Sequence, residues 1–149
     1  MIQQQDFELL RGVVKSRSGL TLSPDKAYLL ENRLMAVARK WGMNDIDGLA
    51  STVRGAPSDD LLREITEAMT TNETLFFRDQ TPFEQLQKVV LPRLLADRRD
   101  KRHIRIWSAG CSSGQEPYSI AMIVKEMGPV FDDWRVDIVA TDISRAMLD

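Results

Sequence analysis

The residues with the clearest chemical potential lie in one stretch, W-S-A-G-C-S-S-G-Q-E-P-Y-S at positions 107–119. Gly110 and Gly114 lack side chains, so a ligand could lie against bare backbone there. A helix opens at Glu116, and the first N–H groups of a helix are free donors. An apolar run before the stretch, residues 103–107, predicts a short buried strand. Strand, small-residue loop and helix N-terminus in this order are typical of a nucleotide- or cofactor-binding α/β domain; a merely structural turn is the alternative.

A carboxylate follows a second predicted strand. Residues 134–141 alternate as a strand does, and Asp142 comes directly after them. In this architecture an acid at the tip of the second strand hydrogen-bonds the two ribose hydroxyls of an adenosine cofactor. The alternative is that Asp142 caps a helix starting at Ser144.

The elements before this region are expected to be helices. Apolar spacing and start and stop residues place them at residues 4–17, 24–41, 45–54 and 59–69. Ser23 and Ser58 are the expected caps. Four helices with short connections predict a small bundle. After the bundle, a capping box predicts a helix start at Thr81, and Pro92 predicts a break in that helix.

The composition of the chain argues against several classes of protein. The net charge of −2 argues against nucleic-acid binding by the chain as a whole. The single cysteine excludes an internal disulfide and fits a reducing compartment, so we expect a cytoplasmic protein. The first residues lack the basic start and apolar core of a signal peptide, and no apolar run is long enough to span a membrane, so we expect neither a secretory leader nor direct membrane insertion. With one cysteine and one histidine, no metal site is predicted, and Cys111 is interpreted as a small loop filler rather than a nucleophile.

Charge is unevenly distributed, with an excess of basic residues between positions 11 and 40 and of acidic residues between 41 and 70. Lys26, Arg33 and Lys40 are seven residues apart and therefore fall on one stripe of the second helix. This stripe is either a docking face for an acidic partner or an ordinary solvated surface.

Four strings in the sequence resemble a known family. T-N-E-T-L-F-F-R-D (71–79), P-F-E-Q-L (82–86), W-S-A-G-C-S-S-G-Q-E-P-Y-S-I-A-M (107–122) and A-T-D-I-S (140–144) are similar to the CheR chemotaxis receptor methyltransferases. The resemblance implies an α/β protein: an N-terminal all-α helical domain followed by the first part of a Rossmann-like S-adenosylmethionine-dependent methyltransferase domain. It divides the chain into a receptor-docking domain (1–70), a linker with connecting helices (71–102) and a partial methyltransferase domain (103–149).

The resemblance also implies roles for single residues. Asn72, Thr74 and Arg78 match positions around the cofactor, and Gly110 matches the glycine that the cofactor approaches closely. Glu116 matches the acid that reaches the methionine part, and Asp142 matches the ribose-binding acid. Arg78 is in addition the expected catalytic residue, which holds the substrate carboxylate; the alternative is that it pairs only with Glu73 or Asp79. Gln115 departs from the family string G-E-E-P-Y-S.

The implied reaction is methylation of glutamate side chains of chemoreceptors, with S-adenosylmethionine as donor and S-adenosylhomocysteine as product. Glutamate has a reference pKa of about 4.3, so the nucleophile is already ionised at neutral pH and needs no general base. The reaction benefits from alignment and from removal of water. The implied partners are the glutamate-rich cytoplasmic methylation helices of chemoreceptors, which the stripe of Lys26, Arg33 and Lys40 would attract.

Two other functions compete with this interpretation. One is a non-catalytic module that binds cofactor or receptor and regulates signalling. The other is a nicotinamide-dependent dehydrogenase, which is disfavoured because G-C-S-S-G departs from G-x-G-x-x-G. Only two strands are predicted, fewer than a doubly wound domain requires, so we expect either a fragment or a sheet that another copy of the chain completes. For this chain alone we expect weak or absent catalysis. Its bare strand edges predict self-association.

Overall fold

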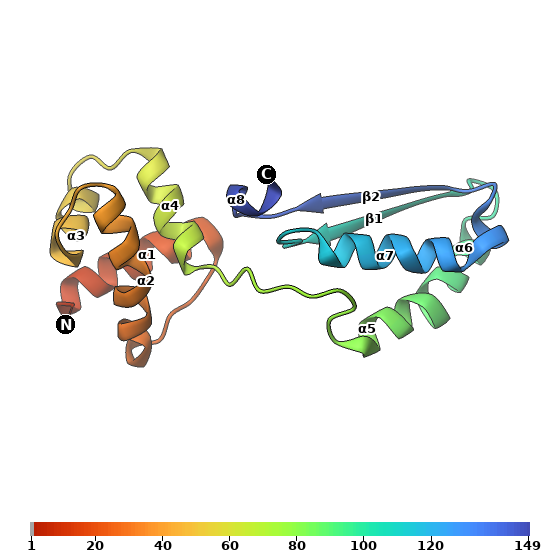
Figure 1. Ribbon diagram of the computed structural model, residues 1–149, viewed down its shortest axis with the longest axis horizontal. Helices are drawn as coiled ribbons and strands as arrows, with labels where there is room; N and C mark the ends of the chain where they lie inside the picture. The colour runs from red at the N-terminus through yellow and green to blue at the C-terminus, as the bar shows by residue number, and fades with distance from the viewer. Residues whose placement is uncertain (1) are drawn as a thin grey trace. The chain divides into compact units, whose positions relative to one another are not determined.

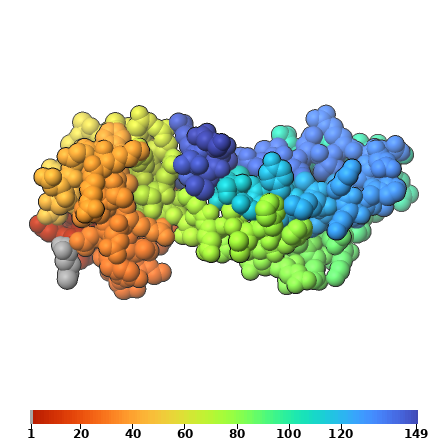
Figure 2. Space-filling view, viewed as in Figure 1, coloured from red at the N-terminus to blue at the C-terminus, as the bar shows by residue number. Residues whose placement is uncertain are grey.

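The computed structural model describes residues 2–149 of the chain (Figure 1). The chain divides into two compact units, Met1–Thr71 and Asn72–Asp149. The second unit therefore also contains the helices that we expected in a connecting segment. The space-filling view shows side chains closely packed within the visible face of each unit (Figure 2). Among residues 2–149, no helix combines the length and the apolar character that crossing a membrane requires.

The first unit is helical throughout its described secondary structure. Its helices are α1 (Gln4–Ser18), a 3₁₀ turn (Pro24–Lys26) that leads into α2 (Ala27–Lys40), α3 (Ile46–Arg54) and α4 (Asp59–Met69). The predicted bundle is thus confirmed, and the predicted ends differ by only a few residues. Apolar side chains at helical spacing fill its centre, and the following are fully buried: Leu10, Leu30, Leu34, Leu49 and Ile65.

The helix caps of this unit were predicted only in part. Ser58 accepts a hydrogen bond from the Leu61 N–H, as expected. Asp45, which is not among the predicted caps, accepts a hydrogen bond from the Gly48 N–H and caps α3. The predicted cap at Ser23 is wrong, because its side chain makes no capping bond and instead interacts with the Asp25 carboxylate.

The second unit begins with a broken helix and continues as a β–α–β unit. Its elements are α5 (Gln80–Gln85), a π-helical turn (Leu86–Val90), α6 (Leu91–Asp97), β1 (His103–Ala109), α7 (Gln115–Glu126), a 3₁₀ turn (Gly128–Phe131), β2 (Arg135–Thr141) and α8 (Arg145–Leu148). The break predicted at Pro92 takes the form of the π-helical turn, since proline has no N–H for the regular ladder. The predicted capping box is wrong: α5 starts at Gln80 and places Thr81 inside the helix.

The two strands pair in parallel, with His103 beside Arg135 and Ala109 beside Thr141. Figure 1 shows α7 lying along the pair. Side chains alternate between the faces of a strand, and the face with Ile104 packs into a cluster with α6 and α7. The other face includes Trp107, which is 70% exposed. The first strand was predicted to be buried, which is correct for one face only.

Candidate cofactor site

The loop after β1 is held open by backbone geometry. Gly110 has φ +80°, and nothing lies within 4 Å of the place where a Cβ would point. The N–H groups of Gly110 and Cys111 both donate to the Thr141 carbonyl oxygen, at 2.8 and 3.0 Å. The loop is therefore tied to the end of β2, while its glycine leaves free space for a ligand beside the backbone.

Gly114 starts the helix that follows the loop. It caps α7 with φ +100°, and a Cβ there would lie 3.3 Å from the Tyr118 ring. Both the conformation and the space thus require glycine. The Gly114 N–H donates to the Cys111 carbonyl oxygen at 3.0 Å, which closes the loop as a tight turn. The first turn of α7 directs its N–H groups toward this loop.

Asp142 lies against the same loop. One carboxylate oxygen accepts the Ser112 N–H at 2.7 Å, and the other accepts the Ser144 N–H at 2.8 Å. The second bond is the local one that the capping alternative requires. Because each carboxylate oxygen has two lone-pair sites, both oxygens retain capacity for a further hydrogen bond. The backbone bonds fix the direction of the carboxylate without exhausting it.

Glu116 brings a second carboxylate to the loop. It is exposed in the first turn of α7, and the Ser108 hydroxyl donates to its Oε1 at 2.7 Å. Burial raises the pKa of the Cys111 thiol, and the negative charges of Asp142 and Glu116 raise it further. Cys111 is therefore protonated at neutral pH, which fits a loop filler. The two acids give the loop a negative potential that suits a cationic ligand.

Residues 72–79, called here the 72–79 segment, contact the loop and α7. The Ser112 hydroxyl donates to the Asn72 carbonyl oxygen at 2.6 Å, and the Phe77 N–H donates to the Ser119 hydroxyl at 2.9 Å. Thr74 is partly buried between these two contacts along the chain. Arg78 donates from Nη1 to the Glu73 carbonyl oxygen at 2.7 Å. Arg78 thus makes a local bond, though to the peptide oxygen of Glu73 and not to its carboxylate.

The basic stripe lies in the other unit. Arg33 is partly buried, and its Nη1 donates to the carbonyl oxygens of Met69 and Thr70, both at 2.9 Å. Lys40 is exposed and pairs with Glu64 at 2.9 Å, and Lys26 is exposed. Arg33 therefore completes the C-terminal end of α4, whose last carbonyls have no partner within the helix.

Three serines at the site were not recognised from sequence. The hydroxyl groups of Ser108, Ser112 and Ser119 bind Glu116, the Asn72 carbonyl oxygen and the Phe77 N–H, respectively. Ser112 also binds Asp142, but through its backbone N–H. The sequence indicates that the loop residues are small, but it does not indicate which groups their hydroxyls bind. For Ser112 and Ser119 these partners lie 40 and 42 residues away in the chain, so local spacing carries no signal for the two contacts.

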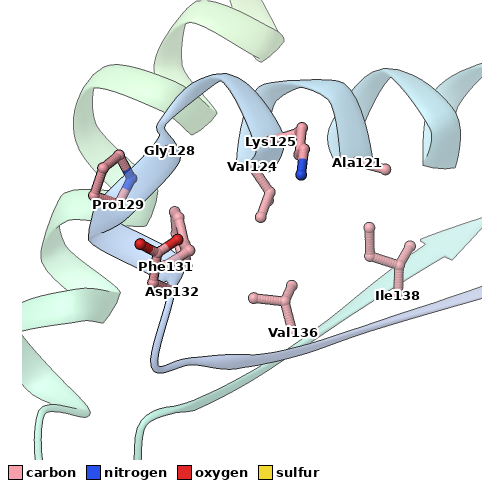
Figure 3. A pocket seen from close by; sticks show the side chains of 9 residues that line it. All are labelled: Ala121, Val124, Lys125, Gly128, Pro129, Phe131, Asp132, Val136 and Ile138. Carbon is pink, nitrogen blue, oxygen red and sulfur yellow. The ribbon is translucent and has the colours of Figure 1, made fainter.

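A hollow elsewhere in this unit is separate from the candidate cofactor site. It measures about 540 Å³ and is lined by residues from the second half of α7, the 3₁₀ turn and β2, among them Val124, Val136 and Ile138. Figure 3 shows these apolar side chains facing one another across the hollow, with Lys125 and Asp132 as its charged groups. None of the predicted site residues lines it. Within residues 2–149, no cluster of three or more histidine, cysteine or acidic side chains could hold a metal ion.

The class of protein follows from these features. A parallel β–loop–α–β unit, a glycine loop beside a helix N-terminus and an acid after the second strand define a nucleotide- or cofactor-binding α/β domain. Residues 72–149 match the family model described as "CheR methyltransferase, SAM binding domain", and residues 5–70 match "CheR methyltransferase, all-alpha domain". The chain belongs to the CheR methyltransferase family, and the predicted fold class is confirmed.

Curated relatives agree with this assignment. The chain is 42% identical over 149 residues to "Chemotaxis protein methyltransferase 1" of Pseudomonas aeruginosa, covering 96% of this chain and 53% of the relative. It is 39% identical over 148 residues to "Chemotaxis protein methyltransferase Cher2" of Pseudomonas putida, with the same coverage. For "Chemotaxis protein methyltransferase 1" of Vibrio cholerae the identity is 40% over 150 residues, covering 99% and 54%. The chain spans about half the length of these relatives.

Proposed function

We propose that this chain binds S-adenosylmethionine and takes part in transfer of its methyl group to glutamate side chains of chemoreceptors, with S-adenosylhomocysteine as product. The observation that carries the proposal is the position of two carboxylates, Asp142 and Glu116, at one glycine loop, each held by a hydrogen bond from a serine. Membership of the CheR methyltransferase family supports the same cofactor.

The residues present fit this cofactor in shape and charge. The free space at Gly110 admits a ligand against the backbone. The unused lone pairs of Asp142 suit two ribose hydroxyls, and Glu116 suits the positively charged methionine part. In a dinucleotide-binding domain the anionic pyrophosphate lies at the helix N-terminus. Here the first turn of α7 carries the carboxylate of Glu116, whose charge would repel a pyrophosphate, and this argues against the dehydrogenase.

The chemistry asks for alignment more than for proton transfer. The cofactor supplies a methyl group on a cationic sulfur, and the glutamate substrate is already ionised. A guanidinium has five N–H donors in a planar fork, and only Nη1 of Arg78 is used by Glu73. The remaining donors would hold the substrate carboxylate in line. Asn72 and Thr74 would border the cofactor from the same segment.

Titration calorimetry with S-adenosylmethionine and S-adenosylhomocysteine tests the cofactor site. Asp142→Ala and Glu116→Gln should each weaken binding about tenfold to hundredfold, because a hydrogen bond to a charged group contributes about 1.5–3 kcal/mol. Asp132→Ala, which removes an exposed acid outside the site, is the matched control and should leave the affinity unchanged. Absence of binding by the unaltered chain, or preferential binding of a nicotinamide dinucleotide, would contradict the proposal.

A transfer assay separates the enzyme from the regulatory module. Labelled donor and a chemoreceptor fragment are incubated with the chain and with a protein of the relatives' full length. Transfer of label to glutamate supports the enzyme. Cofactor binding without transfer by either protein would favour the non-catalytic alternative.

We also propose that the basic stripe attracts acidic receptor helices through Lys26 and Lys40. Arg33 is not part of this proposal, because its guanidinium is already hydrogen-bonded to carbonyl oxygens at the end of α4. Lys26→Glu combined with Lys40→Glu should weaken receptor binding at low salt while cofactor affinity stays constant. Lys88→Glu, which changes an exposed lysine of the other unit, serves as the control. Equal receptor binding by the unaltered chain, the double variant and the control would exclude a role of the stripe in docking.

We further propose that the chain as described self-associates in the cytoplasm or in solution through its two-stranded sheet. The sheet has two unpaired edges among the described residues, and Trp107 is largely exposed on one face. Such edges pair readily with other strands. Light scattering over a concentration series should show species larger than a monomer, and a strictly monomeric chain at high concentration would contradict this.

A further inference from the structure

The hydroxyl group of Ser119 links two parts of the second unit. Ser119 is 0% exposed in the second turn of α7. It donates to the Gln115 carbonyl oxygen at 2.6 Å and accepts the Phe77 N–H at 2.9 Å. A hydroxyl carries one donor and two acceptor sites, so both bonds can form at once. Ser119 therefore joins the helix of the cofactor loop to the 72–79 segment.

The backbone of Phe77 requires such support. Its φ of +51° lies in the left-handed region, which is strained for a bulky residue. A conformation of this kind persists only when the surroundings hold it. Two contacts do so: the bond to Ser119 and the edge-to-face contact of the Phe77 ring with Phe83, whose ring centroid is 5.5 Å away.

The conformation of Phe77 determines where the next side chain starts. Arg78 follows directly in the chain and reaches back to the Glu73 carbonyl oxygen. The other end of the segment is held by Ser112, which donates to the Asn72 carbonyl oxygen. Serines of the loop and helix that form the candidate cofactor site thus fix the segment at Asn72 and at Phe77.

We propose that Ser119 is a positioning residue that, through the Phe77 backbone, sets the direction of Arg78 at the cofactor site. The role in catalysis rests on the proposed function, whereas the role in ordering the segment does not. Space filling alone would be served by alanine or cysteine. The Phe77 N–H, in contrast, needs an acceptor, and neither of these side chains supplies a good one.

Hydrogen exchange read by mass spectrometry tests the ordering. In Ser119→Ala and Ser119→Cys, peptides covering 72–79 should exchange at least about tenfold faster, while β1 and β2 keep their protection. Ser119→Thr retains the hydroxyl and should restore slow exchange. Ser113→Ala, which removes an exposed hydroxyl of the same loop, should leave the segment unchanged. Unaltered exchange in both the alanine and the cysteine variants would overturn the proposal.

A second variant covers the case in which threonine does not fit the buried site. Ser112→Ala removes the bond to Asn72, so exchange should rise at the N-terminal end of the segment while Phe77 stays protected. Faster exchange spread evenly over the second unit in the Ser119 and Ser112 variants would show a general loss of stability and would contradict a local positioning role.

Calorimetry with two ligands then separates positioning from stability. Ser119→Ala should weaken S-adenosylmethionine about tenfold, because Arg78 and its segment are misplaced, but should change adenosine affinity less than about twofold, since Asp142 is untouched. An equal loss for both ligands would overturn the positioning role. If the unaltered chain binds neither ligand, the proposed function is contradicted. The exchange experiment would still test whether Ser119 orders the 72–79 segment.

Discussion

The two units of the chain use their polar side chains for different purposes. In Met1–Thr71, charged groups finish a bundle that apolar side chains already hold together: Arg33 binds the last carbonyls of α4, and Lys40 pairs with Glu64. In Asn72–Asp149 the buried apolar cluster is smaller, and the serines of the loop and of α7 hold irregular backbone in place. In the first unit, polar groups therefore add to a structure that the apolar core already stabilises. In the second unit, they fix the conformation of irregular backbone.

The largest difference between the units should come from their cores. Leu34→Ala removes a fully buried side chain from the bundle and should destabilise the first unit by about 3 kcal/mol, as large-to-small core changes do. Val139→Ala on β2, where the side chain is only partly buried, should cost about 1 kcal/mol or less. Urea unfolding followed by hydrogen exchange of each unit measures both. Equal losses would remove the contrast between the cores.

Arg33 provides a smaller test within the first unit. Arg33→Met keeps much of the apolar stem but removes the donors to Met69 and Thr70, and it should destabilise this unit by about 2 kcal/mol. Arg39→Met, at an exposed position of the same helix, should stay within about 0.5 kcal/mol. Chemical denaturation curves compare the two variants. Equal losses of unfolding free energy in the two variants would show that the hydrogen bonds of Arg33 to the end of α4 do not stabilise this unit.

Cys111 reports on the loop of the second unit. Burial and the charges of Asp142 and Glu116 raise the pKa of its thiol, so the reactive thiolate is scarce in the folded chain at pH 8. Alkylation by iodoacetamide should be at least about tenfold slower in the folded chain than in urea. Asp142→Asn removes one of the charges and should accelerate the folded reaction. Fast alkylation of the folded chain would show that the Cys111 thiol is accessible and would contradict its burial.

The smallest expected effect concerns pH and the start of the sheet. The Arg135 guanidinium and then His103 hold the pKa of Asp137 below its ordinary value. A lowered carboxyl pKa gives stability that is complete above the unfolded value, about 3.9, and that disappears as pH falls through the folded value. At pH 6, Asp137→Asn should therefore unfold at a slightly lower denaturant concentration than the original chain. This difference in stability should begin to shrink below about pH 4 and should disappear as Asp137 becomes protonated in the folded chain. A difference that widens in acid would reverse this sign.

Much of the first unit could be predicted because its signals are local. The bounds of α4 and its cap at Ser58 follow from residues within one or two turns of each other. Two local patterns were nevertheless misread. Ser23 interacts with the Asp25 carboxylate instead of capping, and α5 begins at Gln80, one residue before the predicted capping box at Thr81. The sequence predicted Arg33 to be part of a charged stripe because its partners are backbone carbonyl oxygens, at the last residue of α4 and at the residue after it, and backbone groups give no sequence signal.

The sequence by itself determined the order of elements, the glycine loop and the acid after the second strand. These features could be predicted because glycine spacing and strand alternation depend only on residues close together in the sequence. Only the tertiary structure decided which groups hold that loop. Ser112 meets Asn72 and Ser119 meets Phe77 across 40 and 42 residues of chain. A hydrogen bond depends on distance and direction in space, and no local spacing encodes either of them.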